Sequence, residues 1–196
     1  MKNIVLFASG NGSNVQRIAE YFADSPTVNI VLLICNKADA YVLERAKKLN
    51  INTLLIDKKM FYETGVVVET LQKLHVDMVV LAGFLWLIPK NLIEAFPQKI
   101  INIHPALLPK YGGKGMYGMY VHKAVTENKE THSGITVHYV NANYDEGNII
   151  FQEKCRLSAD DTPEDVAEKV HALEYAHYPI IIEKLLQQSS EKVSRS

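Results

Sequence analysis

Apolar runs of strand length alternate with helix-like segments through the first half of the chain. Residues 4–8 and 78–82 are apolar without a break, as in strands that are covered on both faces. Residues 28–35 and 53–56 are two further strand-like runs. Helical spacing between the runs predicts helices over residues 15–22, 40–49 and 66–74. Alternation of this kind predicts parallel strands with helices on both faces of one sheet.

The pattern changes in the second half. A predicted helix over residues 89–96 leads into a short β-branched strand over residues 100–104. Residues 135–140 alternate between apolar and polar positions, and residues 148–157 form another strand-like run beyond a polar turn. A hairpin is therefore expected here in place of parallel pairing. We predict an α/β fold: a Rossmann-like three-layer α/β/α arrangement with a mostly parallel central sheet and an antiparallel C-terminal part.

The last predicted helix has a clear start. Thr162 can cap it, Pro163 stands at its first position, and Asp165 follows three residues after the cap. The helix is expected to bend or end at Pro179. Residues 1–187 are predicted to form a single domain, and residues 188–196 a polar tail that frays.

Composition and charge narrow the class of partner. The chain of 196 residues carries 21 basic and 22 acidic side chains, a net charge of −1, which argues against a nucleic-acid or membrane-surface binder and favours small-molecule partners. It has no N-terminal signal pattern and no apolar run near the roughly 18 residues of a membrane helix, so a cytoplasmic protein is expected. Cys35 and Cys155 lie in apolar runs and are expected to be buried thiols. No metal-ligand spacing occurs, so no metal is predicted.

A glycine-containing turn, Ser9-Gly10-Asn11-Gly12-Ser13-Asn14, joins the first strand to the first helix. Such a turn points backbone N–H groups and the positive end of a helix at one spot, which suits a phosphate, with Ser13 and Asn14 as cap or ligand. Val15 stands where a dinucleotide fold has its third glycine, and the second strand ends without an acidic residue, so a monophosphate fits better than NAD or ATP. A plain strand-to-helix turn is the alternative.

A second candidate segment, Phe84-Leu85-Trp86-Leu87-Ile88, follows the fourth strand. Ligands gather at the carboxyl ends of strands in such sheets, so this segment can flank a flat aromatic ligand. It can equally be ordinary core at the start of the next helix. The residues alone leave both interpretations open.

Asn102 and His104 stand at the end of the strand over residues 100–104. Residues two apart on a strand point to the same side, and Pro105 biases His104 towards extended backbone. The pair can therefore face one reacting group together. The alternative is a turn asparagine and a hydrogen-bonded core histidine. Residues 112–118 are rich in glycine and predict a mobile loop beside this strand, in which Lys114 can attract an anion or be solvated.

Three further positions carry ionisable groups. His122 lies on a predicted helix over residues 120–126 and is expected to be structural or exposed. Asp145 and the acid after it, taken alone, are typical of solvated caps in a polar turn. His171 and Glu174 share one face of the last helix, where they can reach a ligand or cap the sheet, and spacing does not decide between these roles.

A series of short motifs runs from residue 4 to about residue 179. The motifs are Ser9 to Asn14, Cys35 to Ala40, Leu81 to Phe84, Asn102 to Tyr111, His138 to Val140 with Asp145 to Gly147, and Glu174 before Tyr178-Pro179. In this order they resemble the folate-dependent phosphoribosylglycinamide formyltransferases of purine synthesis.

The resemblance implies an activity and a site. A formyl group would pass from 10-formyltetrahydrofolate, the co-substrate, to the amine of 5'-phosphoribosylglycinamide by direct attack through a tetrahedral intermediate, without a metal. Asn102, His104 and Asp145 would be catalytic: Asn102 and the His104 imidazolium would donate hydrogen bonds to the oxyanion, and Asp145 would stabilise that cation and relay a proton. The implied substrate-binding residues are Gly12, Ser13, Asn14, His171 and Glu174. The implied folate-binding residues are Leu85, Trp86, Leu87, Ile88, Asn102, Val140, Asn141 and Tyr144.

The chain departs from the family pattern in three places. Tyr120 stands where relatives usually have histidine, Trp86 where some have a basic residue, and the glycine-rich stretch at 112–118 is longer than in some of them. A role for Tyr120 and the contacts of the loop are left open, as is the choice between monomer and homodimer.

Three alternative functions would each be expected to need different sequence features from phosphoribosylglycinamide formyl transfer. A formyltransferase acting on initiator methionyl-tRNA would be expected to carry a basic C-terminal domain, which this near-neutral chain lacks. A 10-formyltetrahydrofolate hydrolase would replace the amine by water and would be expected to carry a regulatory domain before the first strand. A non-catalytic nucleotide or folate binder would not need Asn102, His104 and Asp145 together.

Overall fold

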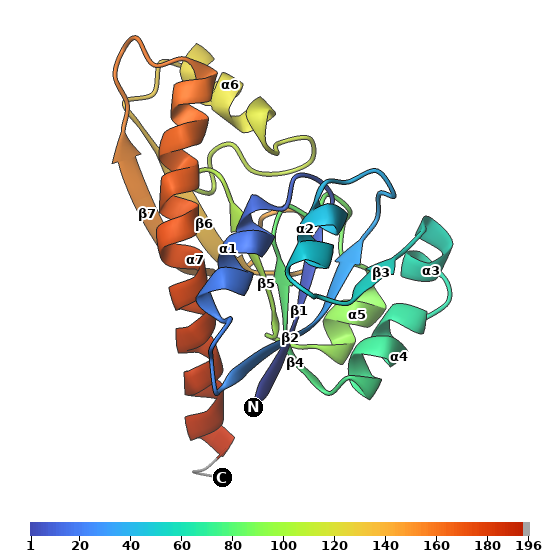
Figure 1. Cartoon of the computed structure of the whole chain (residues 1–196). Coiled ribbons are helices and arrows are strands. Elements are labelled where there is room, and N and C mark those ends of the chain that lie inside the picture. Colours follow the sequence, from blue (N-terminus) through green and yellow to red (C-terminus); the bar gives the residue numbers. More distant parts are fainter. Residues whose placement is uncertain (194–196) are drawn as a thin grey trace.

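The computed structural model describes residues 1–193, with side chains through residue 188. A seven-stranded sheet in the order β3-β2-β1-β4-β5-β6-β7 lies between helices on both faces (Figure 1). The strands are β1 Lys2–Ala8, β2 Val28–Cys35, β3 Thr53–Leu55, β4 Val76–Leu81, β5 Ile100–His104, β6 His132–Tyr139 and β7 Ile149–Arg156. The helices are α1 Ser13–Tyr21, α2 Val42–Lys48, α3 Lys58–Tyr62, α4 Val66–Lys73, α5 Lys90–Ala95, α6 Met119–Glu127 and α7 Pro163–Val193. The predicted α/β/α class is confirmed.

The order of the strands reverses beside β1. This strand lies between β2 and β4 and is parallel to both, so the carboxyl ends of β1 and β4 meet at the reversal, where doubly wound sheets open a ligand crevice. β6 pairs antiparallel with β5 and with β7, as the alternating pattern predicts. In this register Asn102 pairs with His138 and His104 with Thr136, so these four side chains point to the same face.

Two apolar clusters fill the space between the sheet and its helices. Ile4 and Leu6 of β1 point into the cluster that includes residues of α1, α2, α6 and α7, whereas Val5 and Phe7 point into the cluster with residues of α3, α4 and α5. All four side chains are fully buried. The unbroken apolar run of β1 therefore reflects burial on both of its faces.

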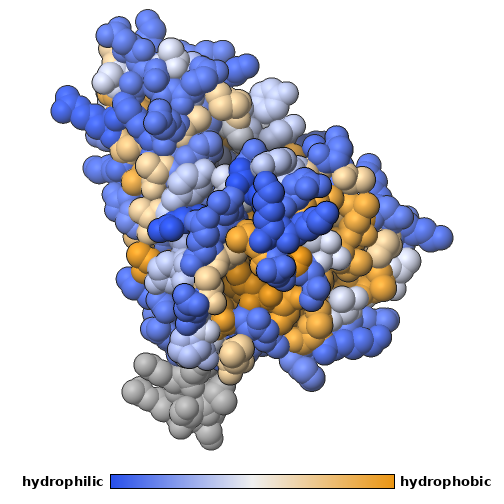
Figure 2. Space-filling model, in the orientation of Figure 1, coloured by the Kyte–Doolittle hydropathy of each residue, from blue (hydrophilic) through white to orange (hydrophobic). Residues whose placement is uncertain are grey.

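The surface carries both kinds of residue. Figure 2 shows polar and charged residues around α6 and the upper end of α7, and apolar residues gathered below α2 on the same face. Exposed apolar area is normal for a soluble domain, so this surface does not by itself identify a partner. None of the helices in the described part of the chain combines the length and the apolar character needed to cross a membrane.

One short helix is absent from the sequence prediction. No helix was predicted between the strand at 53–56 and the helix at 66–74, but the segment after Asp57 folds as α3, with Asp57 accepting a hydrogen bond from the Met60 backbone N–H at 2.7 Å. Phe61 on this helix is buried in the aromatic cluster beneath it. A five-residue helix with one buried side chain is too short to show the helical spacing of apolar residues. Its capping aspartate was the only feature of the sequence that indicated a helix there.

The long C-terminal helix keeps its predicted start but not its predicted end. Thr162 and Asp165 form the reciprocal capping pair, with Thr162 N–H donating to the Asp165 carboxylate at 2.8 Å and Asp165 N–H donating to the Thr162 hydroxyl at 3.2 Å. Of the two outcomes expected at Pro179, a bend or an end, the end is wrong, because α7 continues to Val193. The expected polar tail thus begins inside this helix, and residues 194–196 lie outside the described residues.

Local contacts account for the tolerance of this proline. Pro179 has no N–H for the Tyr175 carbonyl four residues earlier, and Arg17 Nε donates to that carbonyl instead, at 3.3 Å. The neighbouring Tyr178 is fully buried and donates its hydroxyl to the Leu81 carbonyl at 2.9 Å. The contacts made by Arg17 and Tyr178 therefore hold α7 in place at the point where Pro179 interrupts its backbone hydrogen bonds.

Candidate active site

A cavity of about 540 Å³ opens at the carboxyl edge of the sheet. Its walls are the loops after β1, β4 and β5, the glycine-rich segment 113–118, the turn before β7, and residues of α6 and α7. The predicted site residues that line it are Gly12, Ser13, Asn14, Leu85, Asn102, His104, Tyr144, Asp145, His171 and Glu174. One cavity thus brings together the candidates for anion binding and for catalysis.

His104 is buried, with 3% of its surface exposed, and both of its ring nitrogens face a partner. Nε2 lies 2.7 Å from the Tyr111 carbonyl oxygen, and Nδ1 lies 3.5 Å from Asp145 Oδ2. A carbonyl only accepts, so Nε2 carries a hydrogen and Nδ1 is the nitrogen that gains or loses a proton. Burial lowers the pKa of His104 below its usual value, although the Asp145 carboxylate and the Tyr111 carbonyl oppose that effect.

Asp145 is not a solvated cap, since only 11% of its side chain is exposed. Oδ2 accepts a hydrogen bond from the Gly113 backbone N–H at 3.0 Å, and Oδ1 lies 3.5 Å from His138 Nε2. Burial raises the pKa of this carboxyl, but His138 when it is protonated, His104 and the Gly113 N–H together outweigh burial and hold it below its usual value. The carboxylate is therefore ionised between two imidazoles.

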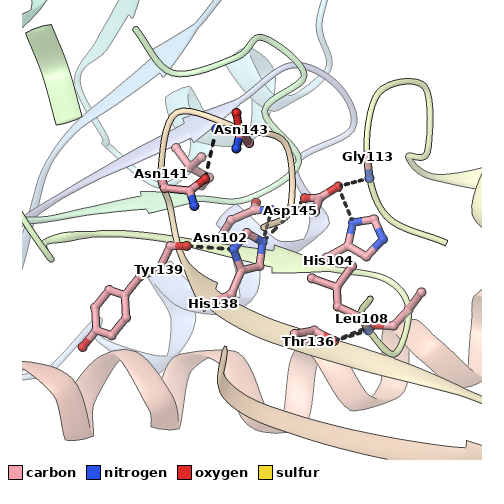
Figure 3. A network of polar contacts seen from close by, with 12 residues as sticks. Asn102, His104, Leu108, Gly113, Thr136, His138, Tyr139, Asn141, Asn143 and Asp145 are labelled. Carbon is pink, nitrogen blue, oxygen red and sulfur yellow. Dashed lines mark hydrogen bonds and ion pairs between the residues drawn. The ribbon is translucent and has the colours of Figure 1, made fainter. Parts of the chain in front are cut away.

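Asn102, two residues before His104 on β5, contacts the second of these imidazoles, His138. Its Nδ2 lies 3.1 Å from His138 Nε2, and His138 Nδ1 lies 2.9 Å from the Tyr139 carbonyl oxygen (Figure 3). The carbonyl places the hydrogen of neutral His138 on Nδ1, so Nε2 accepts from the Asn102 amide. One amide hydrogen of Asn102 then remains for a ligand in the cavity.

The candidate anion loop, Ser9 to Asn14, is shaped by α2. Gly12 caps α1 with φ 77°, in the left-handed region, and a Cβ there would lie 2.2 Å from a Val42 methyl group. Only glycine fits that position. Arg45 donates from Nε to the Asn11 carbonyl and from Nη2 to Asn11 Oδ1, both at 2.9 Å, so α2 holds the loop in place.

Asn14 and Glu174 join this loop to α7. Asn14 Nδ2 donates to Glu174 Oε2 at 2.8 Å, and Glu174 is only 5% exposed. Burial raises the pKa of Glu174 to about 7, with the Asn14 hydrogen bond acting in the opposite direction. The carboxyl beside this loop therefore titrates close to neutral pH, and its protonated form would repel an anion less than its ionised form.

Two histidines border the cavity near this carboxyl. His122 was expected to be structural or exposed, and it is buried, with 1% of its surface exposed, while also lining the cavity. Burial and the nearby His171 lower its pKa to about 4, so it is neutral at physiological pH. His171 lines the same wall, with its ring centroid 6.2 Å from that of His122.

Part of the predicted folate segment does not reach the cavity. Leu85 lines it, but Trp86 packs with Phe61 and Tyr62, at ring-centroid distances of 5.7 and 6.0 Å, and borders a separate depression at the ends of β2 and β3. The Leu87 carbonyl accepts the Tyr62 hydroxyl at 3.0 Å, and Ile88 is buried in the core. The core interpretation thus holds for much of this segment.

Likewise, only some of the predicted site residues in the turn before β7 line the cavity. Tyr144 and Asp145 line the cavity. Val140 donates its N–H to the Ile100 carbonyl at 3.0 Å, and Asn141 Oδ1 accepts from the Asn143 N–H at 3.0 Å, and neither residue lines the cavity. The Val140 backbone N–H and the Asn141 side chain therefore shape the turn rather than the wall.

Several groups of the site are absent from the sequence prediction. His138 belongs to one of the family motifs, but no role was predicted for it, and the Tyr111 carbonyl, the Gly113 N–H and the Arg45 clamp were not identified. His138 enters the site through its pairing with Asn102 across β5 and β6 and its contact with Asp145, and neither contact can be read from one sequence. In the described part of the chain no group of three or more His, Cys, Asp or Glu side chains is placed to hold a metal ion.

These features define an α/β protein with an anion loop and an amide–imidazole–carboxylate group at one edge of its sheet, an arrangement suited to group transfer. Residues 2–182 match the family described as formyl transferase. A phosphoribosylglycinamide formyltransferase from Bacillus subtilis is 36% identical over 191 residues, which cover 95% of each chain. The chain belongs to the formyl transferase family.

Two further relatives extend the comparison. A chloroplastic phosphoribosylglycinamide formyltransferase from Arabidopsis thaliana is 43% identical over 95% of this chain, which spans only 66% of that protein's length. The crystal structure of glycinamide ribonucleotide transformylase 1 from Symbiobacterium toebii has a TM-score of 0.86 at 33% identity, covering 96% of this chain and 89% of that one.

Proposed function

We propose that this protein transfers a formyl group from 10-formyltetrahydrofolate to the amine of 5'-phosphoribosylglycinamide. The observation that carries the proposal is the convergence of Asn102, His104 and Asp145 on one cavity that also contains an anion loop. Relatives that bear the name phosphoribosylglycinamide formyltransferase support the choice of substrates. Residues 1–187 would act as a single domain.

The substrate phosphate is assigned to the turn of Gly12, Ser13 and Asn14. The first turn of α1 consists of uncharged residues, so the free N–H groups and the helix end there favour a dianion. Glu174 would contact the nucleotide beside Asn14, and His171 would lie near the phosphate from α7.

The folate is assigned to the other end of the cavity. Leu85 and Tyr144 line it beside Asn102, and the volume of about 540 Å³ is within the range of small-molecule sites. Trp86, Leu87, Ile88, Val140 and Asn141 would act by supporting the walls or through backbone groups, since their side chains do not line this cavity.

The reaction needs stabilisation of negative charge and movement of one proton. When the amine attacks, a C–N bond forms and the formyl oxygen becomes an oxyanion, to which Asn102 Nδ2–H and protonated His104 Nδ1–H donate hydrogen bonds. Asp145 stabilises the imidazolium and carries the proton lost by the new ammonium. The bond from the formyl carbon to folate nitrogen then breaks, and that nitrogen takes up the proton.

The test is an assay of formyl transfer with purified protein. We expect formylation of 5'-phosphoribosylglycinamide by 10-formyltetrahydrofolate, with much slower transfer to water in its absence. Equal rates with and without the amine would favour the hydrolase alternative, and binding without turnover would favour a non-catalytic binder. We also propose a cytoplasmic location and a state of monomer or homodimer, and sedimentation would decide between the two states.

A further inference from the structure

The segment that follows β5 folds back over the catalytic group. The Tyr111 carbonyl accepts from His104 Nε2 at 2.7 Å, and the Gly113 N–H donates to Asp145 Oδ2 at 3.0 Å. Backbone groups two residues apart therefore contact both the imidazole and the carboxylate. The position of this segment determines the orientation of both catalytic groups.

The backbone of this segment is constrained. Tyr111 has φ 56°, in the left-handed region, which is unfavourable for a residue other than glycine because its Cβ crowds the backbone. A Cβ on Gly112 would lie 2.5 Å from Leu108 Cδ2, so the chain passes close to its own preceding turn. Such a conformation persists only where surrounding contacts hold it.

The Tyr111 side chain is held outside the cavity, where its ring packs against the apolar core and its hydroxyl has a partner. The Tyr111 hydroxyl donates to Glu130 Oε1 at 2.9 Å, and Lys110 Nζ donates to the same oxygen at 2.8 Å. Glu130 stands in the connection between α6 and β6, with 26% of its side chain exposed. The hydrogen bonds from Lys110 and Tyr111 lower the pKa of this carboxyl, so it is an ionised acceptor.

We propose that Glu130 is a positioning residue that acts through the Tyr111 hydroxyl to hold the Tyr111 carbonyl against His104 Nε2. This latch of Glu130 and Tyr111 keeps the hydrogen of neutral His104 on Nε2 and leaves Nδ1 free to exchange a proton. The other titratable groups that face His104 are Asp145 in the turn before β7, His138 on β6 and His122 on α6. None of these three described groups contacts Nε2, so the carbonyl fixes the tautomer.

The kinetic test rests on the proposed function and compares four variants. Tyr111→Phe removes only the hydroxyl, Glu130→Ala removes the acceptor, Glu130→Gln keeps an uncharged acceptor, and Lys110→Met removes only the exposed ion pair. We expect the first two to lower kcat about tenfold with KM within about twofold, because loss of one hydrogen bond to an ionisable group changes its pKa by about one unit. The limb of the kcat–pH profile set by His104 should move to lower pH in the same two variants.

Conservative and control variants separate positioning from stability. Glu130→Gln and Lys110→Met should keep kcat and the pH profile close to the wild type, since Tyr111 retains an acceptor in both. Glu94→Ala breaks a surface pair of the same kind with Lys90, 3.5 Å away, and should change nothing. Wild-type kcat and pH profiles in Tyr111→Phe would overturn the inference.

A second readout does not depend on activity. In ¹⁵N NMR of the imidazoles, with His104 assigned by His104→Gln, the neutral ring should show hydrogen on Nε2 in the wild type and a mixture of tautomers in Tyr111→Phe and Glu130→Ala. Hydrogen on Nδ1 in the wild type, or spectra unchanged by both variants, would overturn the inference. If the wild type transfers no formyl group, the proposed function fails while this measurement still decides the role of Glu130.

Discussion

The reactivity of His104 depends on which of its nitrogens can exchange a proton. The family resemblance implied an imidazolium, whereas burial lowers the pKa of this ring and favours its neutral form in the free protein. With Nε2 held by a carbonyl, Nδ1 is the nitrogen that must gain a proton before the ring can donate to the oxyanion in the proposed reaction. Asp145, 3.5 Å away, favours the protonated state as it forms.

Asp145 should therefore be needed for turnover more than for binding. We predict that Asp145→Asn lowers kcat by about a hundredfold or more, because it removes the charge that stabilises the imidazolium. The affinity for 5'-phosphoribosylglycinamide, measured by calorimetry, should change little.

The adjacent carboxylate provides the control for this variant. Glu146 bonds to Asn143 Nδ2 at 2.7 Å and does not line the cavity, so Glu146→Gln should retain activity. Full turnover in Asp145→Asn would exclude the carboxylate from the mechanism.

The sequence could identify some residues of the candidate site and not others, for physical reasons. Asn102 and His104 are two residues apart on one strand, and that spacing alone sets their common direction. Asp145 lies far along the chain in a polar turn, and only the family resemblance assigned it. His138 enters through strand pairing and Tyr111 through a backbone carbonyl, and neither property is visible in residue type.

At the scale of single elements, the long apolar strands were predicted most accurately from the sequence. β1 and β4 were predicted to within a few residues because burial on both faces requires unbroken apolar runs. α3 was missed and the end of α7 was misplaced, because a capping aspartate and a side chain from α1 decide those two points. Short-range sequence patterns do not contain these tertiary contacts.

The junction of α1 and α2 gives a prediction of its own. Gly12→Ala would place a Cβ 2.2 Å from a Val42 methyl group in a left-handed conformation. We expect the variant to raise KM for the phosphate-bearing substrate at least about tenfold, since movement of the loop misdirects its N–H groups. Substrate saturation kinetics measure this effect.

Gly65→Ala is the matched control for backbone strain. Gly65 has a comparable φ of 71°, but a Cβ added there would meet none of the described atoms within 4 Å, and the residue lies outside the cavity lining. This control should lose about 1–2 kcal/mol of stability with normal KM. Equal KM values in the two variants would contradict the assignment of the phosphate to this loop.

Across the whole molecule, two buried groups in the cavity make opposite contributions to pH-dependent stability. Glu174 has a pKa of about 7 against an ordinary 4.5, so the folded state holds a proton that the unfolded chain releases between these values, and stability falls as pH rises through that window. His122 has a pKa of about 4 against 6.5, so the unfolded chain binds the extra proton and stability falls as pH decreases. Their effects offset each other between about pH 4.5 and 6.5.

Substituting either Glu174 or His122 should reveal how the remaining residue makes stability depend on pH. We predict that Glu174→Gln unfolds with up to about 3 kcal/mol more free energy than the wild type at pH 8 and with nearly the same free energy at pH 4. Urea unfolding at both pH values measures the difference. Glu168→Gln, on the exposed face of the same helix, should follow the wild type at both.

His122→Phe makes the complementary prediction. The phenyl ring is not protonated, so the acid-induced loss of stability specific to His122, up to about 3 kcal/mol between pH 7 and pH 4, should disappear. Only the contribution of Glu174 then remains, and the variant should gain stability relative to the wild type as pH falls. His132→Gln, at an exposed position on β6, should leave the wild-type pH dependence unchanged. Parallel stability curves for His122→Phe and the wild type would show that His122 titrates normally in the folded protein and is not held neutral by the cavity.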